Sequence, residues 1–153
     1  MKNILITGGS GTIGKILMPY LLGYGYNVDN YDLLKGDDVF DEEKLLNRCK
    51  NIDVIIHLAA IPHPCLKGIE DSKYWKINFD GTKAVFNAAK NSGIKKFIYL
   101  SSGCVYGFWG GYCKPDQFPI IESNYKPSLE EGLTVYGATK IASEEYLKEN
   151  SKS

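Results

Sequence analysis

A glycine-rich turn near the N-terminus constrains the fold of this chain more than any other feature of its sequence. It follows a short run rich in Ile and Leu, Lys2–Thr7, which is typical of a strand buried on both faces. It precedes a segment, Thr12–Gly23, whose apolar residues recur every three or four positions, as in a helix. The turn fits two glycine spacings, G-x-G-x-x-G at Gly9, Gly11 and Gly14, and G-x-x-G-x-x-G at Gly8, Gly11 and Gly14. A strand, a glycine turn and a helix in this order predict close approach of a pyrophosphate to backbone N–H groups at the start of the helix.

The rest of the chain alternates between short β-type runs and helical patterns. Further strands are predicted at Asn27–Asp32, Asp53–Leu58 and Lys96–Ser101. Further helices are predicted at Glu42–Cys49, Ser72–Asn91 and Thr134–Glu149. This alternation predicts an α/β fold with a parallel sheet and helices on both faces. Right-handed crossovers then place the first strand centrally, with the later strands added on one side.

Composition excludes several classes of function. The 153 residues carry 18 basic and 18 acidic side chains, Arg48 is the only arginine, and no basic stripe occurs, so we expect no nucleic-acid partner. No apolar run is long enough to span a bilayer, and no targeting signal is visible, so we expect no membrane partner. The four cysteines show no C-x-x-C spacing, which favours free thiols in a reducing, cytoplasmic compartment.

An acidic residue at the end of the second predicted strand sharpens the glycine motif. Asp32 follows Gly14 by 18 residues, where a carboxylate would accept hydrogen bonds from a ribose 2′-OH. Asp32 would repel a 2′-phosphate, and the sequence offers no arginine nearby to receive one, so the site favours NAD over NADP. The alternative is a glycine-rich turn in some other α/β fold.

A tyrosine and a lysine four residues apart open the last predicted helix. Tyr136 and Lys140 would share one helix face, but the spacing alone means little, because chance predicts about one Y-x-x-x-K match and Tyr31 to Lys35 is another. Ser102 follows a strand at the carboxyl edge of the sheet, where ligands bind in such folds. A cationic lysine and a positive nicotinamide would favour the phenolate, so that Tyr136 acts as a general base. The alternatives are a strand-end cap for the serine and a solvated helix face for Lys140.

Two other features carry less weight. The segment Gly107–Leu133 is rich in Gly, Pro and aromatic residues, and a loop of that length is often functional, although a surface excursion packed by its own aromatics is an equal alternative. A metal site at His57, His63 and Cys65 lacks further ligands at a recognisable spacing, so we predict no metal.

Taken together, these motifs resemble the extended short-chain dehydrogenase/reductase family, specifically the NAD-dependent nucleotide-sugar epimerases and dehydratases typified by UDP-glucose 4-epimerase. The resemblance covers essentially the whole chain. Its motifs are Thr7–Gly14, Asp32, Asp38-Val39, Asp53–Ala60, Asn78-x-x-Gly81-Thr82, Ser101–Gly107 and Tyr136–Lys140.

The resemblance implies a Rossmann-like domain with assigned site residues. The cofactor-binding residues that it implies are Gly8, Gly11, Thr12, Ile13, Gly14, Asp32, Asp38, Val39, Leu58, Ala59, Ala60, Asn78, Tyr136 and Lys140. The catalytic residues that it implies are Ser102, Tyr136 and Lys140. In the family the phenolate removes a proton from a sugar hydroxyl while hydride passes to NAD, and the serine hydroxyl assists. Dehydratases of the family usually carry an acid just after this serine, where the chain has Gly103 and Cys104, which favours an epimerase or a reductase.

Family members are about twice as long as 153 residues. We therefore expect residues 1–153 to form an incomplete NAD-binding domain, truncated after the Tyr-x-x-x-Lys helix and without the C-terminal substrate domain. The strand Lys96–Ser101 would be an unpaired edge that seeks a partner. Expected partners are a nucleotide sugar and either a missing C-terminal half or a second copy, paired through Ser72–Asn91 and Thr134–Glu149. An inactive fragment that binds NAD or pairs with another chain is the alternative function.

Overall fold

The computed structural model describes residues 1–62, 68–107, 122, 129 and 133–151. The chain forms two compact units, each built from two stretches of sequence. Unit 1 comprises Met1–Ala60 and Gly81–Leu100, and unit 2 comprises Ile61–Asp80 and Ser101–Ser153. Most of the loop predicted over Gly107–Leu133 lies outside the described residues, as do His63 and Cys65.

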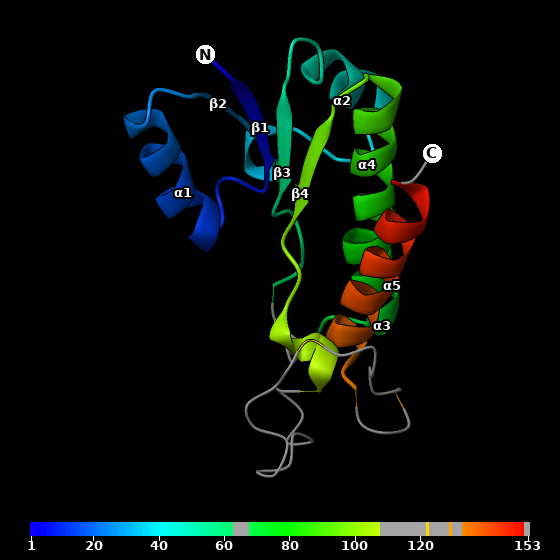
Figure 1. The fold of residues 1–153 in the computed structure, drawn as a ribbon. Helices are drawn as coiled ribbons and strands as arrows, with labels where there is room; N and C mark the ends of the chain where they lie inside the picture. Colours follow the sequence, from blue (N-terminus) through cyan, green and yellow to red (C-terminus); the bar gives the residue numbers. More distant parts are fainter. Residues whose placement is uncertain (63–67, 108–121, 123–128, 130–132, 152–153) are drawn as a thin grey trace. The chain divides into compact units, whose positions relative to one another are not determined.

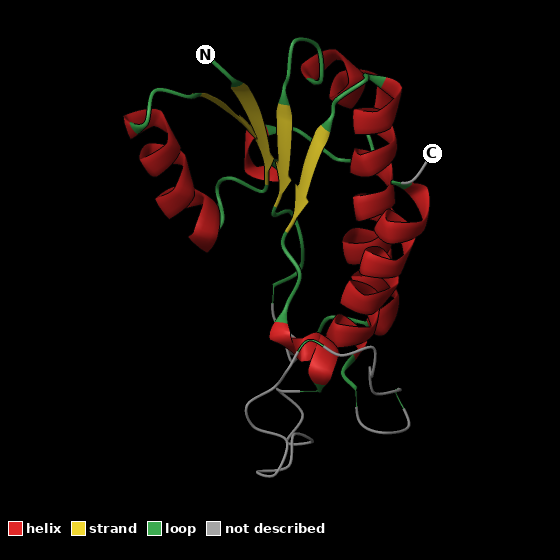
Figure 2. Cartoon of the chain, viewed as in Figure 1, coloured by secondary structure: helices red, strands yellow, loops and turns green. Residues whose placement is uncertain are grey.

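Unit 1 contains a sheet of four parallel strands (Figures 1 and 2). The strands are β1 (Asn3–Thr7), β2 (Asn27–Tyr31), β3 (Val54–His57) and β4 (Lys96–Tyr99), in the spatial order β2-β1-β3-β4. The prediction of a parallel sheet with a central first strand is therefore confirmed. Each strand is up to two residues shorter than predicted at either end, so that Asp32 and Ser101 lie just beyond their strands.

Helices cover both faces of this sheet, as predicted. On one face, Ile4, Ile6, Val54 and Ile56 pack against Leu17, Met18 and Leu21 of α1 (Thr12–Gly23). On the other face, Leu5, Tyr31 and Ile55 pack against Leu45 of α2 (Glu42–Arg48) and against Val85, Ala88 and Ala89 of α4 (Gly81–Asn91). Figure 1 shows α1 on one side of the strands and α2 and α4 on the other. The alternation of side chains along each strand thus supplies two separate apolar clusters.

Local signals fix the ends of these helices. α1 ends at Gly23, and Gly25 follows with φ of 82°, a left-handed conformation that glycine adopts at low cost. Asp41 caps α2 because its side chain accepts a hydrogen bond from the Lys44 N–H at 3.0 Å. A short 3₁₀ helix, η1 (Leu33–Lys35), follows β2.

Unit 2 is formed by helical segments. They are α3 (Asp71–Tyr74), the π-helix η2 (Trp75–Asp80), the 3₁₀ helix η3 (Gly103–Tyr106) and α5 (Val135–Asn150). Ile61, Tyr74, Cys104 and Tyr136 form its apolar cluster. Thr134 caps α5 by accepting a hydrogen bond from the Gly137 N–H at 3.1 Å.

The prediction of one regular helix over Ser72–Asn91 is wrong. The structure has α3, then the π-helical turn η2, then α4, and the division between the two units falls between Asp80 and Gly81. The buried amide of Asn78 lies within η2, where it binds a segment distant in sequence, and such contacts do not appear in a helical pattern. No helix in the described part of the chain is both long and apolar enough to cross a membrane.

Candidate functional site

Two glycines of the turn after β1 occupy places that no other residue could fill. A Cβ on Gly14 would lie 2.3 Å from the carbonyl oxygen of Gly9, so α1 begins in direct contact with the turn. Gly8 has φ of 74°, and a Cβ there would lie 2.7 Å from Cα of Ala59. Both contacts are with backbone, which cannot move aside as a flexible side chain can. The turn therefore brings backbone segments together at distances that require glycine.

The other two glycines separate the two motif spacings. A Cβ on Gly9 would lie 2.4 Å from Oδ1 of Asn30, which belongs to a side chain, and a Cβ on Gly11 would lie 3.2 Å from the Gly8 carbonyl oxygen. Backbone contact thus requires glycine at positions 8 and 14. The spacing Gly8, Gly11, Gly14 describes the observed turn better than the spacing that starts at Gly9.

The N-terminus of α1 is capped without a side chain. Gly11 is the N-cap residue, its backbone is extended, and no acidic residue lies in the first turn. Thr12 and Ile13 are exposed, and Ile13 keeps 50% of its surface accessible. Because the first N–H groups of a helix have no partner within it and the helix dipole is positive there, this end of α1 can receive an anion.

Asp32 holds the glycine turn from the neighbouring strand. Its side chain is buried, with Oδ2 accepting from the Ser10 N–H at 2.8 Å and Oδ1 accepting from the Leu34 N–H at 2.9 Å. Each carboxylate oxygen retains capacity for a further hydrogen bond. Asp32, the residue predicted to bind the ribose, therefore lies directly beside the turn and also shapes it.

The segment after η1 contains the other predicted acidic position. Asp38 is exposed, and its carbonyl oxygen accepts from the Tyr31 hydroxyl at 2.8 Å. Val39 packs against the apolar cluster on the α2 and α4 face. Burial and the charge of Asp37 raise the pKa of Tyr31 to about 12, so its hydroxyl stays a donor. The backbone at Asp38 and Val39 is thereby fixed next to the end of β2.

Arg48 lies closer to this region than the sequence suggests. It extends from α2 to Asp29 on β2, with Nε to Oδ2 at 3.0 Å and Nη2 to Oδ1 at 2.7 Å, and its Nη1 lies 3.8 Å from Asp37. The sequence argument expected no arginine near Asp32 that could receive a 2′-phosphate. The guanidinium is engaged by carboxylates, which compete with a 2′-phosphate.

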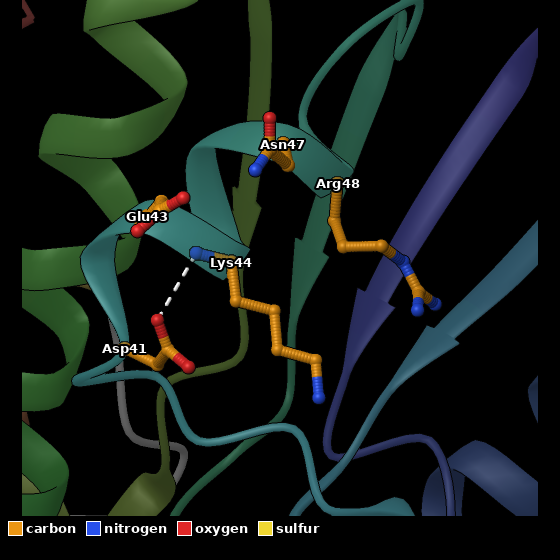
Figure 3. Close-up of a pocket in the computed structure, with 5 residues that line it drawn as sticks. All are labelled: Asp41, Glu43, Lys44, Asn47 and Arg48. Carbon is orange, nitrogen blue, oxygen red and sulfur yellow. Dashed lines mark hydrogen bonds between the residues drawn. The ribbon is translucent and has the colours of Figure 1, made fainter.

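A surface pocket of about 290 Å³ lies along the same helix (Figure 3). Its lining residues are Asp41, Glu43, Lys44, Asn47 and Arg48. Lys44 is paired at 2.7 Å with the buried Asp37. Burial opposes ionisation of Asp37, but its hydrogen bond to Lys44 and the two nearby cations lower its pKa. Lys44 and Arg48 are thus paired with carboxylates of the chain itself, and the pocket contains none of the predicted site residues.

The end of β3 lines the other side of the glycine turn. Leu58 donates its N–H to the Thr7 carbonyl oxygen at 3.0 Å and packs with the α1-facing cluster. Ala59 and Ala60 follow and are half-buried, and Ala59 is the residue that Gly8 approaches. Unit 1 therefore contains all eleven of the predicted cofactor-binding residues from Gly8 to Ala60, along the segments that follow β1, β2 and β3.

Unit 2 brings together all three predicted catalytic residues. Ser102 lies before η3, accepts from the Cys104 N–H at 3.2 Å, and hydrogen-bonds with the side chain of Tyr136. Nζ of Lys140 lies 5.7 Å from the centroid of the Tyr136 ring. Tyr136 is 8% exposed and Lys140 is 4% exposed. Lys140 is thus not on a solvated helix face, and Ser102 is both a cap and a partner of the tyrosine.

Burial sets the charges of this group. It lowers the pKa of Lys140 to about 8, against the opposing influence of Glu144 and Cys104. Burial also raises the pKa of Tyr136, an effect that the hydrogen bond from Ser102 opposes. At neutral pH the tyrosine is therefore a phenol and the lysine is mostly an ammonium. The sequence argument expected the phenolate from Lys140 together with a positive nicotinamide ring, and Lys140 by itself leaves Tyr136 a phenol.

Asn78, another predicted cofactor-binding residue, lies in unit 2 with its side chain bound to the backbone. Its Oδ1 accepts from the Ile61 N–H at 2.7 Å, and its Nδ2 donates to the Ile61 carbonyl oxygen at 3.3 Å. The side chain is 1% exposed and also contacts Thr139 Oγ1 at 3.5 Å. The side chain of Asn78 thus links η2 to the backbone of Ile61.

Two polar contacts were missed by the sequence argument. His57, which the sequence placed in a strand and considered as a metal ligand, is buried and links Thr7 Oγ1 at 2.6 Å and Thr82 Oγ1 at 3.0 Å inside unit 1. Glu144 forms a short hydrogen bond with Ser101 inside unit 2. The spacing of Glu144 four residues after Lys140 was the signal that could have identified it. Among the described residues, no group of three or more His, Cys, Asp and Glu side chains is placed to hold a metal ion.

Comparisons with known proteins agree with this geometry. The model of the NAD dependent epimerase/dehydratase family matches residues 4–153. The chain is 30% identical over 181 residues to a dTDP-D-glucose 4,6-dehydratase of Dictyostelium discoideum, covering 100% of this chain and 41% of that protein. It is 26% identical over 155 residues to a UDP-glucose 4-epimerase of Streptomyces lividans, covering 90% of this chain and 44% of that protein.

A solved structure matches over the whole chain. It is the UDP-glucose 4-epimerase from Brucella ovis in complex with NAD, with a TM-score of 0.85, 26% identity, and coverage of 100% of this chain and 49% of that one. The chain thus spans less than half the length of the curated relatives just described.

Proposed function

Because the chain belongs to the NAD dependent epimerase/dehydratase family, we propose that it is the NAD-binding portion of an enzyme acting on a nucleotide sugar. The reaction is hydride transfer at a sugar hydroxyl or keto carbon, in an epimerase or a reductase. The observation that carries this proposal is the glycine turn between β1 and α1, from Gly8 to Gly14, at the N-terminus of α1. The NAD complex of the Brucella ovis epimerase, which this chain resembles along its length, supports the choice of cofactor.

The residues of unit 1 fit a dinucleotide. Gly11 caps α1 without a side-chain hydrogen bond, so the backbone N–H groups at the start of the helix can receive a pyrophosphate. Thr12 and Ile13 would supply N–H groups there. Asp32 would accept from the adenosine ribose, and Asp38 and Val39 would border the adenine. Leu58, Ala59 and Ala60 would line the cofactor cleft.

The residues of unit 2 supply acid–base chemistry. NAD, when bound, provides the carbon that accepts and returns hydride, and a positive ring. Tyr136 takes the proton from the reacting sugar hydroxyl and returns it to the carbonyl in the reverse step. Ser102 holds the reacting oxygen through the hydroxyl that already contacts Tyr136. Lys140 supplies positive charge at the tyrosine ring and would also hold the nicotinamide ribose.

An epimerase or reductase fits better than a dehydratase. Water elimination needs an acid and a base beside the catalytic serine, and Ser102 is followed by Gly103 and by Cys104, which is buried. The two curated relatives described above are an epimerase and a dehydratase, so similarity alone does not choose between these reactions. Because positions 103 and 104 carry no carboxylate, we assign the chain to hydride transfer without elimination of water.

We further propose that the chain works with a partner, either a second copy or a chain that carries the remainder of the enzyme. Support comes from β4, which is an edge of the sheet in the described structure and carries Ile98 at 41% exposure, with Leu100 just after it at 39%. Apolar side chains at an open sheet edge favour pairing.

The two described cysteines, Cys49 and Cys104, are thiols, which supports a reducing, cytoplasmic compartment.

Calorimetric titration of the chain with NAD and with NADP tests the function. We expect NAD to bind, NADP to bind at least tenfold more weakly, and Asp32→Ala to weaken NAD about tenfold through loss of charge-assisted hydrogen bonds. Glu43→Ala, a change of an exposed carboxylate on α2, is the matched control and should leave binding unchanged. A folded chain that binds neither nucleotide would overturn the proposal. Binding without turnover, even with a partner carrying the rest of the enzyme, would identify an inactive NAD-binding fragment instead.

A further inference from the structure

A serine and a glutamate outside the predicted site meet next to it in unit 2. The Ser101 hydroxyl donates a short hydrogen bond to Oε1 of Glu144, which is 43 residues away in sequence. Both side chains are half-buried. Ser101 immediately precedes Ser102, which contacts Tyr136, so adjacent serines bind two residues of the same helix that lie eight positions apart.

Glu144 lies on the helix face that carries the candidate catalytic pair. Tyr136, Lys140 and Glu144 are spaced four residues apart on α5, which places them in succession along one side of the helix. The carboxylate of Glu144 acts electrostatically on Lys140 in the direction that favours the ammonium. Along this face of α5, Lys140 thus lies between Tyr136 and Glu144.

The surroundings of Lys140 make this carboxylate important. Lys140 is 4% exposed, and a buried ammonium is costly without a compensating charge. The neighbouring buried residues of α5, Thr139 and Ser143, are neutral and direct their hydroxyls to backbone carbonyl oxygens at 2.8 Å. Among the described residues, the charges of Glu144 on the same helix and of Cys104 on η3 raise the pKa of Lys140, and the ring of Tyr136 lies 5.7 Å from its Nζ. Of these groups only Glu144 is a carboxylic acid.

We propose that Ser101 and Glu144 form a positioning pair that keeps Lys140 charged and directed at the ring of Tyr136. Ser101 orients the carboxylate by its hydrogen bond, and Glu144 compensates the charge of the ammonium. Neither residue touches the reacting atoms. The inference rests on the proposed function for its catalytic meaning, but the charge state of Lys140 can be measured without turnover.

The test is the pH dependence of Lys140 acylation. The intact chain is treated with acetic anhydride across pH 6 to about 10, and labelling of each lysine is followed by mass spectrometry of peptides. Exposed Lys148 on the same helix is the internal reference. The variants are Glu144→Gln, Glu144→Asp and Ser101→Ala, with Glu145→Gln as the matched control because Glu145 is exposed on the same helix.

Glu144→Gln can still bond to Ser101 but has no charge. We expect it to reduce the ratio of ammonium to amine at Lys140 about tenfold at a given pH, because an opposite charge close to an ammonium favours the charged form. Glu144→Asp should restore much of that ratio, Ser101→Ala should lower it less than Glu144→Gln, and Glu145→Gln should leave it unchanged. Circular dichroism confirms that each variant is folded.

An unchanged labelling profile in folded Glu144→Gln would overturn the inference and leave the pair as a structural link between η3 and α5. A change equal to that of Glu145→Gln would do the same. If Glu144→Gln fails to fold, Glu144→Asp and Ser101→Ala carry the test. A chain that shows the Lys140 effect but binds no NAD refutes the proposed function alone, and a chain that binds NAD without the effect refutes the inference alone.

Discussion

Unit 1 presents backbone atoms at its candidate site, whereas unit 2 presents side chains. In unit 1 the glycines bring backbone segments together, and an apolar core on each face of the sheet supports them. In unit 2 the buried face of α5 is largely polar and includes Tyr136, Thr139, Lys140 and Ser143. The difference teaches that a site made of backbone tolerates no added atoms, while a site made of buried polar groups tolerates no lost partners.

The largest expected effect tests the tight backbone of unit 1. Gly14→Ala places a Cβ 2.3 Å from the Gly9 carbonyl oxygen, so we expect a loss of about 3 kcal/mol in the free energy of unfolding, measured by urea denaturation, with loss of NAD binding. Gly23→Ala in the same helix is the control, because nothing lies within 4 Å of its Cβ, and it should be neutral or slightly stabilising. Equal stability of both variants would contradict the description of the turn.

The second effect tests whether a buried polar group in unit 2 tolerates the loss of its hydrogen-bond partner. Asn78→Ala leaves the N–H and carbonyl of buried Ile61 without their hydrogen bonds, which we expect to cost about 2 to 3 kcal/mol of unfolding free energy. Asn91→Ala, at an exposed helix end, should cost less than about 0.5 kcal/mol. A mild Asn78→Ala phenotype in urea denaturation would show that unit 2 relaxes around a missing amide.

A third variant should stabilise unit 2, because function rather than folding explains its buried charge. Lys140→Met replaces a buried ammonium, whose charged form burial disfavours, by an apolar chain of similar length, and we expect a gain of about 2 kcal/mol at pH 7. Glu144 tolerates the loss because it is half-buried and keeps its hydrogen bond to Ser101. The pKa of Lys140 falls from 10.5 to about 8 on folding, so the unfolded chain binds more protons between those values and wild-type stability rises with pH there. The gap between variant and wild type should therefore close toward pH 10. Lys148→Met, at an exposed position, should show neither effect.

The smallest effect concerns the ion pair behind β2 in unit 1. Asp37→Asn removes the 2.7 Å pair with Lys44, which is 41% exposed, and we expect a loss of about 1 kcal/mol at pH 7. The pKa of Asp37 is lowered in the folded chain, against burial, by Lys44 and Arg48, so this contribution is present above its ordinary value and disappears as the pH falls through the folded value. Glu43→Gln is the exposed control. Urea denaturation from pH 7 to about 3 should show the unfolding free energies of wild type and Asp37→Asn becoming equal as the pH falls.

The same contrast explains what the sequence could predict. The α1 helix was predicted at its observed bounds, and the four strands within two residues, because apolar periodicity and glycines are local signals. The glycine turn and Asp32 follow one another in a fixed order and needed no knowledge of distant contacts. Ser102, Tyr136 and Lys140 were selected by their place after a strand and at the start of a helix, and the structure brings them together.

Contacts between distant segments were not predictable in this way. The amide of Asn78 binds Ile61, 17 residues earlier, and this contact lies in a π-helical turn that periodicity treats as ordinary helix. Ser101 and Glu144 are 43 residues apart, and their pairing depends on how α5 packs in unit 2. The contact of Arg48 with Asp29, 19 residues earlier, likewise depends on how α2 packs beside β2 in the folded chain.

The central claim is that the glycine turn and the start of α1 receive the pyrophosphate of NAD. Amide resonances of the ¹⁵N-labelled chain, followed during titration with NAD, test it most directly. The account predicts that the largest saturable shifts fall on Gly9 to Gly14 and on Leu34, whose N–H shares the carboxylate of Asp32. Shifts confined to residues away from this turn, or none at saturating NAD in a folded chain, would contradict it.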